Sequence, residues 1–537
     1  MQFGIIYFLG GMSALLVFWQ FWPNLFSAIF IWTALSFFCV SCAYFTNSPG
    51  IFRKKRNGKI PFFIKLAFIP FLVIIHSYNK MARNLDKVPS IQRVNDKLFI
   101  GDRVTPSDAP VLIEKQIKAV LDVTAEFESL NWAASLENIT YLNIPVLDHA
   151  IPTEEDLLRA VIWIKNQQVY NGSVLVNCAL GRGRSALVVA AFLLSRTKSN
   201  DVPDVLEDLK ALRKTIRLNK RQRKLLMKVV EHEQFSGLPK AWIIANPASG
   251  AGKWAEYKDQ IVEDLSSHYL LTIKESSETA SIASITEEAV LDEPDTVIAC
   301  GGDGTVSEVA DKLVDTSIKL GIIPGGTTNA LCHVLMGVKV KLLPVETACA
   351  LITAGRTRLI DTAKCNNRLV LLLVGLGFEQ KMIEAAGRQE KDEYGQFAYL
   401  RGLWQAVQNN DLFTMTLILD DGEPFSIETN SLVVANAAPL TTILAQGKGN
   451  PDYFDGLLDI TWIKSEPNTG GNSIVGLLEL SVSGMLNVNP GFSIGHLHAK
   501  KIQITVQPAS NYVIDGEVYP PEELNISILP KSLHVYC

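Results

Sequence analysis

Two long apolar segments open the chain, and alternating apolar and polar positions follow them. No Asp, Glu, Lys or Arg occurs before Arg53, and residues 3–22 and 25–46 are apolar almost throughout. Each segment, at about 20 residues, is long enough to cross roughly 30 Å of hydrocarbon as a helix. Pro23 and Asn24 divide the two segments, as a tight hairpin would. The pattern therefore predicts two transmembrane helices.

A basic cluster follows the second segment, at Arg53, Lys54, Lys55, Arg56 and Lys59. Basic residues beside a membrane span mark its cytoplasmic side. We therefore expect an integral protein of the cell inner membrane with its catalytic domains in the cytoplasm.

A third apolar segment, residues 60–78, leaves two alternatives open. It has enough apolar residues to span a bilayer, but Pro61, Lys65 and Pro70 interrupt it. An odd number of spans would also place either the basic cluster or the C-terminal domains outside the cell. We favour an interfacial or re-entrant segment over a third span, within an anchor of residues 1–80.

Composition limits the classes of partner. The 537 residues are 48% hydrophobic and 20% charged, which excludes a disordered chain and indicates several domains. The net charge of −5 gives no support to a nucleic-acid partner. The eight cysteines form no regular framework, so no disulfides are expected. His496 and His498 have no neighbouring ligand in the sequence, and no zinc site is predicted.

A strand, a glycine-rich loop and an apolar helix are predicted over residues 173–195, SVLVNCALGRGRSALVVAAFLLS. The loop would lie at a helix N-terminus, where free N–H groups favour a bound phosphate and a thiolate at Cys178. Arg184 can bind two phosphate oxygens at once, a geometry that lysine lacks. Asp148 follows a predicted strand and can protonate a leaving oxygen, then deprotonate water in a second step.

These residues resemble the cysteine-based dual-specificity phosphatases over residues 89–236. The resemblance implies a catalytic set of Cys178, Arg184, Ser185 and Asp148, acting on a phosphomonoester. The family usually has histidine before the nucleophile, where this chain has Asn177.

The resemblance leaves the substrate and the activity of this domain open. Arg182 gives the loop a GRxRS order that is similar to phospholipid-directed members, but it would also suit a solvent-facing arginine. Residues 210–228 contain nine basic and no acidic side chains, which suits either anionic headgroups or a solvated helix face. The alternatives are a lipid phosphatase, a protein phosphatase, or a catalytically silent module that binds phosphate.

Three further strand-loop-helix units are predicted after residue 240, in AWIIANPASGAGK, TVIACGGDGT and KLGIIPGGTTNAL. Three such units in series indicate a parallel sheet whose loops meet at the carboxyl ends of the strands. Glycines there let the backbone approach phosphate groups closely. The first loop differs from a Walker A sequence because Pro247 stands at the first glycine position.

The three loops resemble those of the diacylglycerol kinase catalytic domain, as found in bacterial soluble lipid kinases and sphingosine kinases. The resemblance implies that ATP and Mg²⁺ are used and that a lipid with a free hydroxyl accepts the phosphoryl group. It assigns Asp515 and Glu517 to catalysis, with Glu517 as the base, and Asp452, Asp455 and the Leu457 carbonyl to the metal. The nucleotide-binding residues implied are Asn246, Pro247, Ser249, Gly250, Gly301, Gly302, Asp303, Gly304, Thr305, Gly326 and Thr327.

The fold class predicted for the whole chain is multidomain α/β with N-terminal transmembrane helices. By the same resemblance, residues 240–365 form a nucleotide-binding α/β domain. Residues 366–537 form a lipid-holding β-sandwich, with a helix near residues 399–408. The predicted function is a membrane-anchored bifunctional enzyme, an ATP-dependent lipid kinase with a cysteine-dependent phosphatase domain. The alternatives are a kinase carrying the silent module or a protein-directed phosphatase.

Overall fold

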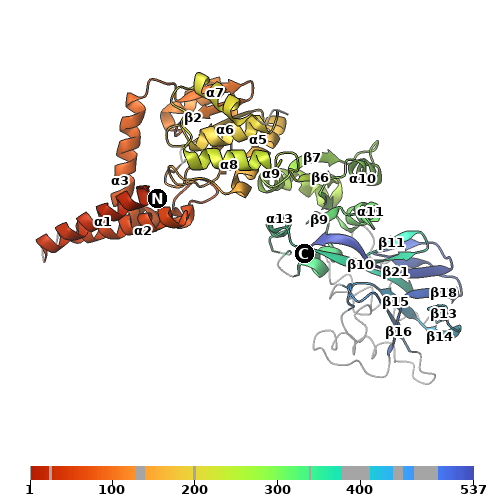
Figure 1. Ribbon diagram of the computed structural model, residues 1–537. Helices are drawn as coiled ribbons and strands as arrows, with labels where there is room; N and C mark the ends of the chain where they lie inside the picture. Colours follow the sequence, from red (N-terminus) through yellow and green to blue (C-terminus); the bar gives the residue numbers. More distant parts are fainter. Residues whose placement is uncertain are drawn as a thin grey trace. The chain divides into compact units, whose positions relative to one another are not determined.

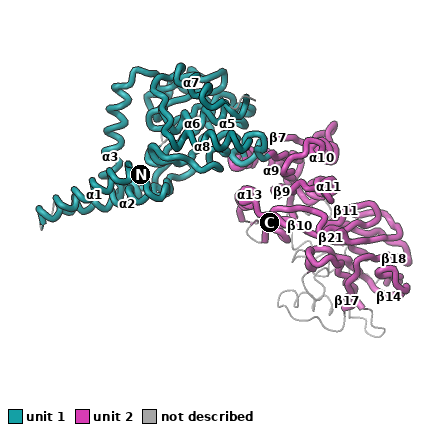
Figure 2. The backbone as a smooth tube through the Cα atoms, in the orientation of Figure 1, with its two compact units in different colours: residues 1–239, 266–270 teal, residues 240–265, 271–537 magenta. Residues whose placement is uncertain are grey.

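The chain divides into two compact units, which Figure 2 shows in different colours. One unit is residues 1–239 with 266–270, and the other is residues 240–265 with 271–537. The structure is a computed structural model. It describes residues 2–22, 27–128, 139–197, 201–337, 340, 342–377, 412–438, 451–464 and 494–537.

The first unit opens with three apolar helices (Figure 1). Their bounds are α1 Gln2–Phe21, α2 Ser27–Thr46 and α3 Phe62–Leu85, with a short 3-10 helix, η1, at Pro49–Phe52. Within the described residues, these three are the helices long and apolar enough to cross a membrane. Both predicted transmembrane segments are thus helical, and residues 60–78 fall largely within one continuous helix that contains Pro70.

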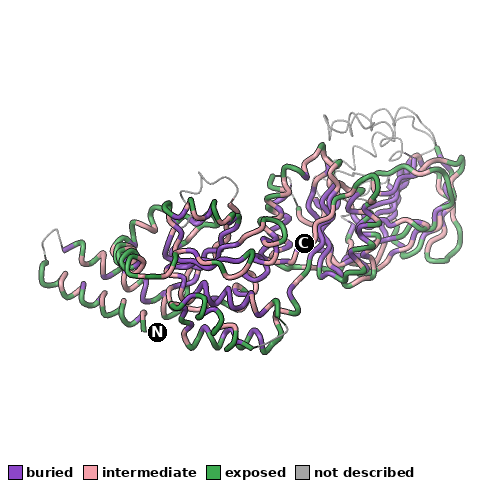
Figure 3. The backbone as a smooth tube through the Cα atoms, turned by 90° about the horizontal axis from the view of Figure 1, so that it is seen from above, coloured by how far each residue is buried: buried purple, intermediate pink, exposed green. Residues whose placement is uncertain are grey.

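Glycines hold α1 against α2. A Cβ atom at Gly4, Gly10 or Gly11 would lie within 3.2 Å of a phenylalanine ring of α2, so only glycine permits this approach. Small residues serve this purpose between membrane helices because lipid gives apolar side chains no incentive to associate. The outer faces of α1 and α2 expose large apolar side chains, such as Trp19 at 84%. Figure 3 shows how little of this pair is buried compared with the strands of the sheets.

The rest of the first unit is a five-stranded sheet flanked by helices. Its strand order is β1-β2-β5-β3-β4, with β2, β5, β3 and β4 parallel and β1 antiparallel. β5 is buried on both faces, as its run of Val and Leu predicts. The strands are β1 Ile91–Asn95, β2 Leu98–Gly101, β3 Ile117–Asp122, β4 Thr140–Asn143 and β5 Ser173–Asn177. The helices are η2 Pro106–Asp108, α4 Ala109–Glu114, α5 Glu154–Tyr170, α6 Arg184–Leu194, α7 Val202–Leu212 and α8 Lys220–Glu231.

The second unit combines a mixed ten-stranded sheet with a six-stranded sheet. The larger sheet runs β14-β13-β18-β21-β9-β8-β6-β7, with β10 paired to β21 and β11 paired to β10. The smaller sheet runs β17-β16-β15-β12-β19-β20. Apolar side chains from both sheets form a shared core, as expected of a β-sandwich.

The long strand β21 joins the two parts of this unit. It pairs antiparallel with β10 and β18 of the sandwich and parallel with β9 of the nucleotide-binding part. One sheet therefore continues across the predicted boundary at residue 365. The predicted helix at residues 399–408 lies outside the described residues.

The parallel strands of the second unit are β6 Lys240–Ala245, β7 Leu270–Glu275, β8 Thr296–Gly301 and β9 Lys319–Pro324. The strands of the sandwich are β10 Thr357–Cys365, β11 Arg368–Val370, β12 Leu373–Gly377, β13 Phe413–Leu419, β14 Phe425–Thr429, β15 Ser431–Ala435, β16 Leu458–Ile463, β17 Ile494–Ala499, β18 Lys501–Gln507, β19 Tyr512–Ile514, β20 Glu517–Tyr519 and β21 Leu524–Tyr536. The helices are η4 Ser249–Gly252, α9 Lys253–Leu265, α10 Ile282–Leu291, α11 Asp303–Leu313, α12 Ala330–Met336 and α13 Pro344–Ala354.

A buried ion pair fastens the segment after α2 to the sheet of the first unit. Lys54 Nζ lies 2.6 Å from Asp122 Oδ2, and both side chains are almost fully buried. Tyr141 and Thr124 also donate hydrogen bonds to this carboxylate. Lys54 is therefore a structural residue, whereas the sequence placed it with the basic residues beside the membrane.

We predict that Lys54→Met destabilises the first unit strongly. The substitution leaves the Asp122 carboxylate buried without its cation, which costs about 3–5 kcal/mol in comparable pairs. Thermal unfolding of the detergent-solubilised protein measures the effect, with Lys55→Met at an exposed position as the matched control. Equal unfolding temperatures for the two variants would contradict this assignment.

Candidate functional site

The loop after β5 approaches the end of β2 more closely than a side chain would allow. Gly181 has φ +64°, and a Cβ atom there would lie 2.8 Å from the Gly101 carbonyl. The backbone N–H of Cys178 points to the same carbonyl at 3.4 Å. Glycine at position 181 is thus required both by its left-handed conformation and by this approach. The loop opens directly into α6, which begins at Arg184.

The Arg184 guanidinium is held on several sides. It is 2% exposed, lies 2.9 Å from Glu126 Oε1 and 3.1 Å from Glu126 Oε2, and donates to the Val146 carbonyl at 2.7 Å. Asp148 Oδ1 lies 3.1 Å from its Nη2 atom. Burial alone would lower the pKa of Arg184, but Glu126, Asp148 and Cys178 raise it above its ordinary value. The site thus holds a permanently charged and oriented guanidinium, a group that can bind phosphate oxygens.

The four predicted phosphatase residues meet at this loop. Cys178 Sγ lies 3.3 Å from Ser185 Oγ, and Arg184 bridges to Asp148. The Asp148 side chain is 43% exposed and also accepts a hydrogen bond from the backbone N–H of His149. An acid that reaches solvent beside a buried arginine and a cysteine suits transfer of a proton to a leaving oxygen.

Glu126 is a functional candidate that the sequence reasoning missed. It follows β3, which lies next to β5 in the sheet, so its carboxylate reaches the loop after β5. A signal existed, because an acidic residue in the loop after a buried parallel strand lies at the ligand-binding edge of such a sheet. Only the strand order identifies its partner as Arg184.

The anchor helices contact this loop directly. Asn79 of α3 donates a hydrogen bond of 2.8 Å to the Ala179 carbonyl, and Asp86 at the end of α3 pairs with Arg182 at 2.9 Å. The Phe3 ring of α1 stacks on His149, with ring centroids 4.5 Å apart. Arg182 therefore forms an ion pair with Asp86, and its side chain remains 37% exposed.

Helix α3 follows the surface of the phosphatase-like sheet over most of its length. Besides the contact at Asn79, Lys65 pairs with Glu128 at 2.8 Å, and Arg83 pairs with Asp102 at 3.0 Å. Burial raises the pKa of Asp102 to about 6, even though Arg83 opposes the rise. A helix tied at both ends to a water-soluble domain is poorly placed to cross a bilayer, and this favours an interfacial α3.

The basic run at residues 210–228 is not a uniform charged face. Arg213 is almost fully buried and donates to the Pro89 carbonyl at 2.6 Å and to the Leu180 carbonyl at 3.5 Å. Lys228 pairs with Glu154. Arg213 therefore supports the cysteine loop and cannot face anionic headgroups.

The second candidate site lies at a topological switch point. Strands β6 and β8 are parallel neighbours, and their following connections lead to β7 on one side and β9 on the other. Ligands of open α/β sheets bind where the connections diverge in this way. The loops after β6 and β8 carry the NPASG and GGDGT sequences, so the predicted nucleotide residues meet at this point.

The three glycine loops approach one another through their backbones. A Cβ atom at Gly250 would lie 1.8 Å from the Gly325 carbonyl oxygen, and one at Gly326 would lie 2.5 Å from the Gly302 Cα atom. The Gly325 N–H donates to the Gly301 carbonyl at 2.8 Å. The loops thus form a cradle lined by backbone, with the N-terminus of α11 at its side, and such a cradle suits phosphate groups.

Side chains hold this cradle together. Asn246 Nδ2 donates to Thr305 Oγ1 at 3.3 Å, which links the first loop to α11. Asn329 bonds to both the N–H and the carbonyl of Gly326. Lys253 Nζ lies 3.5 Å from the Gly326 carbonyl, and the sequence reasoning did not select this residue. A small pocket beside the cradle is lined by Asn246, Ser249, Lys253, Trp254, Tyr257, Ile261, Cys300, Gly301, Ile323, Pro324 and Gly325.

The two carboxylates of the DGE motif have different surroundings. Asp515 accepts hydrogen bonds from the backbone N–H groups of Leu371, Leu372 and Leu373, and burial raises its pKa to about 6. Glu517 is exposed at the edge strand β20, in contact distance of Gly304 at the start of α11. Glu517 is therefore the accessible carboxylate of the two, whereas Asp515 is bound to the backbone.

The residues predicted to bind the metal lie in one turn before β16. Asp452 accepts a hydrogen bond from the N–H of Phe454, and Asp455 accepts one from the N–H of Leu457. Burial raises the pKa of Asp455, and the nearby Asp459 and Asp452 carboxylates add to the effect. The buried Asp361 accepts from the N–H of Gly456 and so fixes the turn.

Comparison with known proteins assigns both units. Residues 98–232 match the model of the dual specificity phosphatase catalytic domain, and residues 240–365 match that of the diacylglycerol kinase catalytic domain.

Two relatives and one solved structure are similar to part of the chain. "Uncharacterized protein sll0036" of Synechocystis is 37% identical over 55% of this chain and 69% of its own length. A "Putative lipid kinase" of Staphylococcus haemolyticus is 30% identical over 45% of this chain and 76% of its own length. A crystal structure of a putative diacylglycerol kinase from Bacillus anthracis is 25% identical, with a TM-score of 0.46, covering 55% of this chain and 94% of that one. The match to the Staphylococcus haemolyticus relative and the two family models show that the chain belongs to the lipid kinase family with a diacylglycerol kinase catalytic domain, and that it carries a dual specificity phosphatase catalytic domain ahead of it.

Proposed function

We propose that the protein is a membrane-anchored enzyme with two activities. The second unit transfers the γ-phosphoryl group of ATP to a lipid hydroxyl, and the first unit hydrolyses a lipid phosphomonoester through Cys178. The kinase proposal rests chiefly on the backbone cradle at the switch point, with Glu517 beside it. The proposal places the anchor in the cell inner membrane and both catalytic units on its cytoplasmic side.

The cradle fits a nucleotide phosphate because its walls are backbone. Any side chain at Gly250 or Gly326 would fill the space between the loops. The groups proposed to bind ATP are the N–H groups of these loops and the N-terminus of α11, with Lys253 as a nearby cation. Asp452, Asp455 and the Leu457 carbonyl are oxygen ligands of the kind that Mg²⁺ prefers. When bound, Mg²⁺ would neutralise charge that develops on the phosphate groups.

Glu517 is the proposed general base of phosphoryl transfer. Its carboxylate would accept the proton of the lipid hydroxyl while the hydroxyl oxygen bonds to the γ-phosphorus and the bond to ADP breaks. Tyr519 donates a hydrogen bond of 3.0 Å to Glu517 Oε2, which orients the carboxylate. Glu517 lies next to Gly304, at the end of α11 that is proposed to bind phosphate.

In the phosphatase step, the Cys178 sulfur would bond to phosphorus as the ester bond breaks. Asp148 would protonate the leaving oxygen and then take a proton from the water that releases phosphate. Arg184 would hold the phosphate oxygens, and Glu126 keeps its guanidinium in position.

The proposal of a lipid substrate rests on the anchor contacts. Asn79 and Asp86 of α3 bond to the cysteine loop, and Phe3 of α1 stacks on the residue after Asp148. Helices that enter a membrane have their ends at the headgroup level. An interfacial α3 would also lie at this level, so a catalytic loop bonded to it would be close to phosphate groups in the bilayer surface, where a bulky phosphoprotein has less access.

We predict that substitution of Glu517 lowers activity, whereas substitution of Asp515 lowers stability. Glu517→Gln should lower the rate of lipid labelling from ATP by about 10²–10⁴-fold, because a base is removed, and leave the unfolding temperature unchanged. Asp515→Asn should lower the unfolding temperature, because one oxygen that accepts a backbone N–H is lost. The expected loss in the free energy of unfolding is about 1–3 kcal/mol. Labelled-lipid assays and thermal unfolding of both variants test the assignment. Full activity of Glu517→Gln would remove the proposed base.

We predict that Gly250→Ala impairs ATP binding much more than Gly252→Ala. Both glycines have positive φ, but a Cβ atom at Gly250 meets the Gly325 carbonyl, whereas one at Gly252 has nothing within 4 Å. The expected rise in the ATP dissociation constant is at least about tenfold for Gly250→Ala, equivalent to roughly 1.4 kcal/mol. Calorimetry of nucleotide binding measures it, and equal affinities would show that the cradle does not bind ATP.

We predict that phosphatase turnover requires Cys178 and depends on the mole fraction of lipid phosphate in the bilayer. Phosphate release from phosphatidic acid in vesicles should vary with its mole fraction in the bilayer and vanish in Cys178→Ser. Release from a soluble phosphotyrosine peptide should be at least about tenfold slower, because the loop is held at the interface. Preference for the peptide would favour a protein phosphatase, and binding of phosphate without turnover would favour the silent module.

A further inference from the structure

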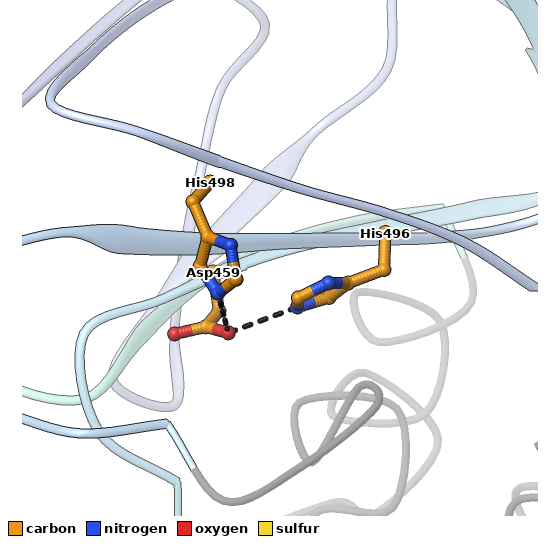
Figure 4. Close-up of side chains that lie close together, drawn as sticks. All are labelled: Asp459, His496 and His498. Atoms are coloured by element: carbon orange, nitrogen blue, oxygen red, sulfur yellow. Dashed lines mark hydrogen bonds and ion pairs between the residues drawn. The ribbon is translucent and has the colours of Figure 1, made fainter. Parts of the chain in front are cut away.

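Two histidines and a carboxylate meet on one face of the six-stranded sheet. His496 and His498 lie two residues apart on β17, so their side chains share a face. In the register of β16 and β17, Asp459 pairs with His498 and Thr461 pairs with His496. Figure 4 shows both imidazole rings facing the same oxygen of Asp459. The expectation that these histidines have no partner is therefore wrong.

The three ligand atoms all lie within 4.8 Å of one another, and the two distances from Asp459 to the histidines are those of neighbouring metal ligands. Asp459 Oδ1 lies 2.9 Å from His496 Nε2 and 3.1 Å from His498 Nε2. Neighbouring ligands bound to a transition metal at about 2.0–2.2 Å stand about 2.8–3.6 Å apart, for octahedral to tetrahedral angles. The two rings are perpendicular, with centroids 4.6 Å apart, so both can approach one ion without colliding.

Burial and an unpaired hydroxyl support a site that binds something. The side chains of Asp459 and His496 are each about nine-tenths buried, and that of His498 is 48% exposed. Thr461, on the same face beside His496, is almost fully buried, and its Oγ1 has no hydrogen-bond partner among the described residues. Buried hydroxyl groups are almost always paired, so the Thr461 hydroxyl is a polar group on this face that an ion-bound water could pair with.

We propose that Asp459, His496 and His498 bind a divalent transition metal of the Zn²⁺ class. Imidazole nitrogens suit Zn²⁺ and its neighbours, whereas Mg²⁺ prefers ligand sets made of oxygen. Three protein ligands leave one coordination position open for water. Water can reach this position past the half-exposed His498. The ion would join β16 to β17. Among the described residues, this is the one group of three or more histidine, cysteine and acidic side chains with this spacing.

The residues proposed to bind this ion differ from those proposed to bind the magnesium of the kinase. Asp452, Asp455 and the Leu457 carbonyl offer oxygen atoms only, and Asp459 is not among them. The proposal also stands without the kinase assignment, because its test measures bound metal and not turnover.

The test uses the full-length protein, purified in detergent without a histidine tag and stripped with a chelator. We expect one equivalent of Zn²⁺ per chain to bind, and millimolar Mg²⁺ to leave it in place. Replacement by Co²⁺ should produce a visible absorption band from the nitrogen and oxygen ligands. Binding of far less than one equivalent, or displacement by Mg²⁺, would overturn the proposal.

Two variants locate the ion. His498→Gln removes a half-exposed ligand and should weaken Zn²⁺ binding by at least about tenfold and abolish the Co²⁺ band. His232→Gln, at an exposed histidine after α8, is the matched control and should retain both. Asp452→Asn should also retain Zn²⁺. If His498→Gln binds the metal as well as wild type, or if Asp452→Asn loses it, the ion is elsewhere.

Discussion

Close contact between backbone segments is the constraint on which the kinase site depends. Where the loops after β6, β8 and β9 meet, a carbonyl of one loop occupies the space that a side chain of another would need. Positions 250 and 326 have no side chain because both are glycine. The loops therefore present backbone N–H groups there, beside the positive end of a helix dipole. The parallel order of the strands brings these loops together, so the phosphate-binding surface is a product of topology as much as of composition.

The cysteine loop of the first unit follows the same rule with a different chemical group. Gly181 lies against the end of β2, while Arg184 is fixed by the carboxylate of Glu126. Removal of the Glu126 or the Asp148 carboxylate would leave the buried Arg184 guanidinium without one of its negatively charged partners. Such a loss lowers the free energy of unfolding. The anchor contributes through Asn79 and Asp86, which bond to the same loop. Membrane attachment and the phosphatase site are therefore parts of one bonded network.

Local pattern predicted much of this from the sequence. The strand ending at Asn177, the loop from Cys178 and the three glycine loops were predicted, because each is encoded in consecutive residues. What local pattern could not supply was pairing between distant segments. Glu126 reaches Arg184 only because β3 neighbours β5, and Asp459 reaches His498 only through the register of β16 and β17.

Chemical type alone also misled where burial decided the role. Lys54 belongs to a basic cluster in the sequence, yet it is buried against Asp122. Asp515 was expected to support Glu517, and its oxygens accept three backbone N–H groups that the motif itself does not identify. In both cases a distant backbone or carboxylate supplies the partner, and no property of the neighbouring residues reveals it.

The most direct test of the central claim is an experimental structure of the protein with a non-hydrolysable ATP analogue and Mg²⁺. The account predicts phosphate groups against the backbone of Gly250, Gly302 and Gly326, with the terminal phosphate directed toward Glu517. A nucleotide bound away from these loops, or a terminal phosphate directed away from Glu517, would contradict it.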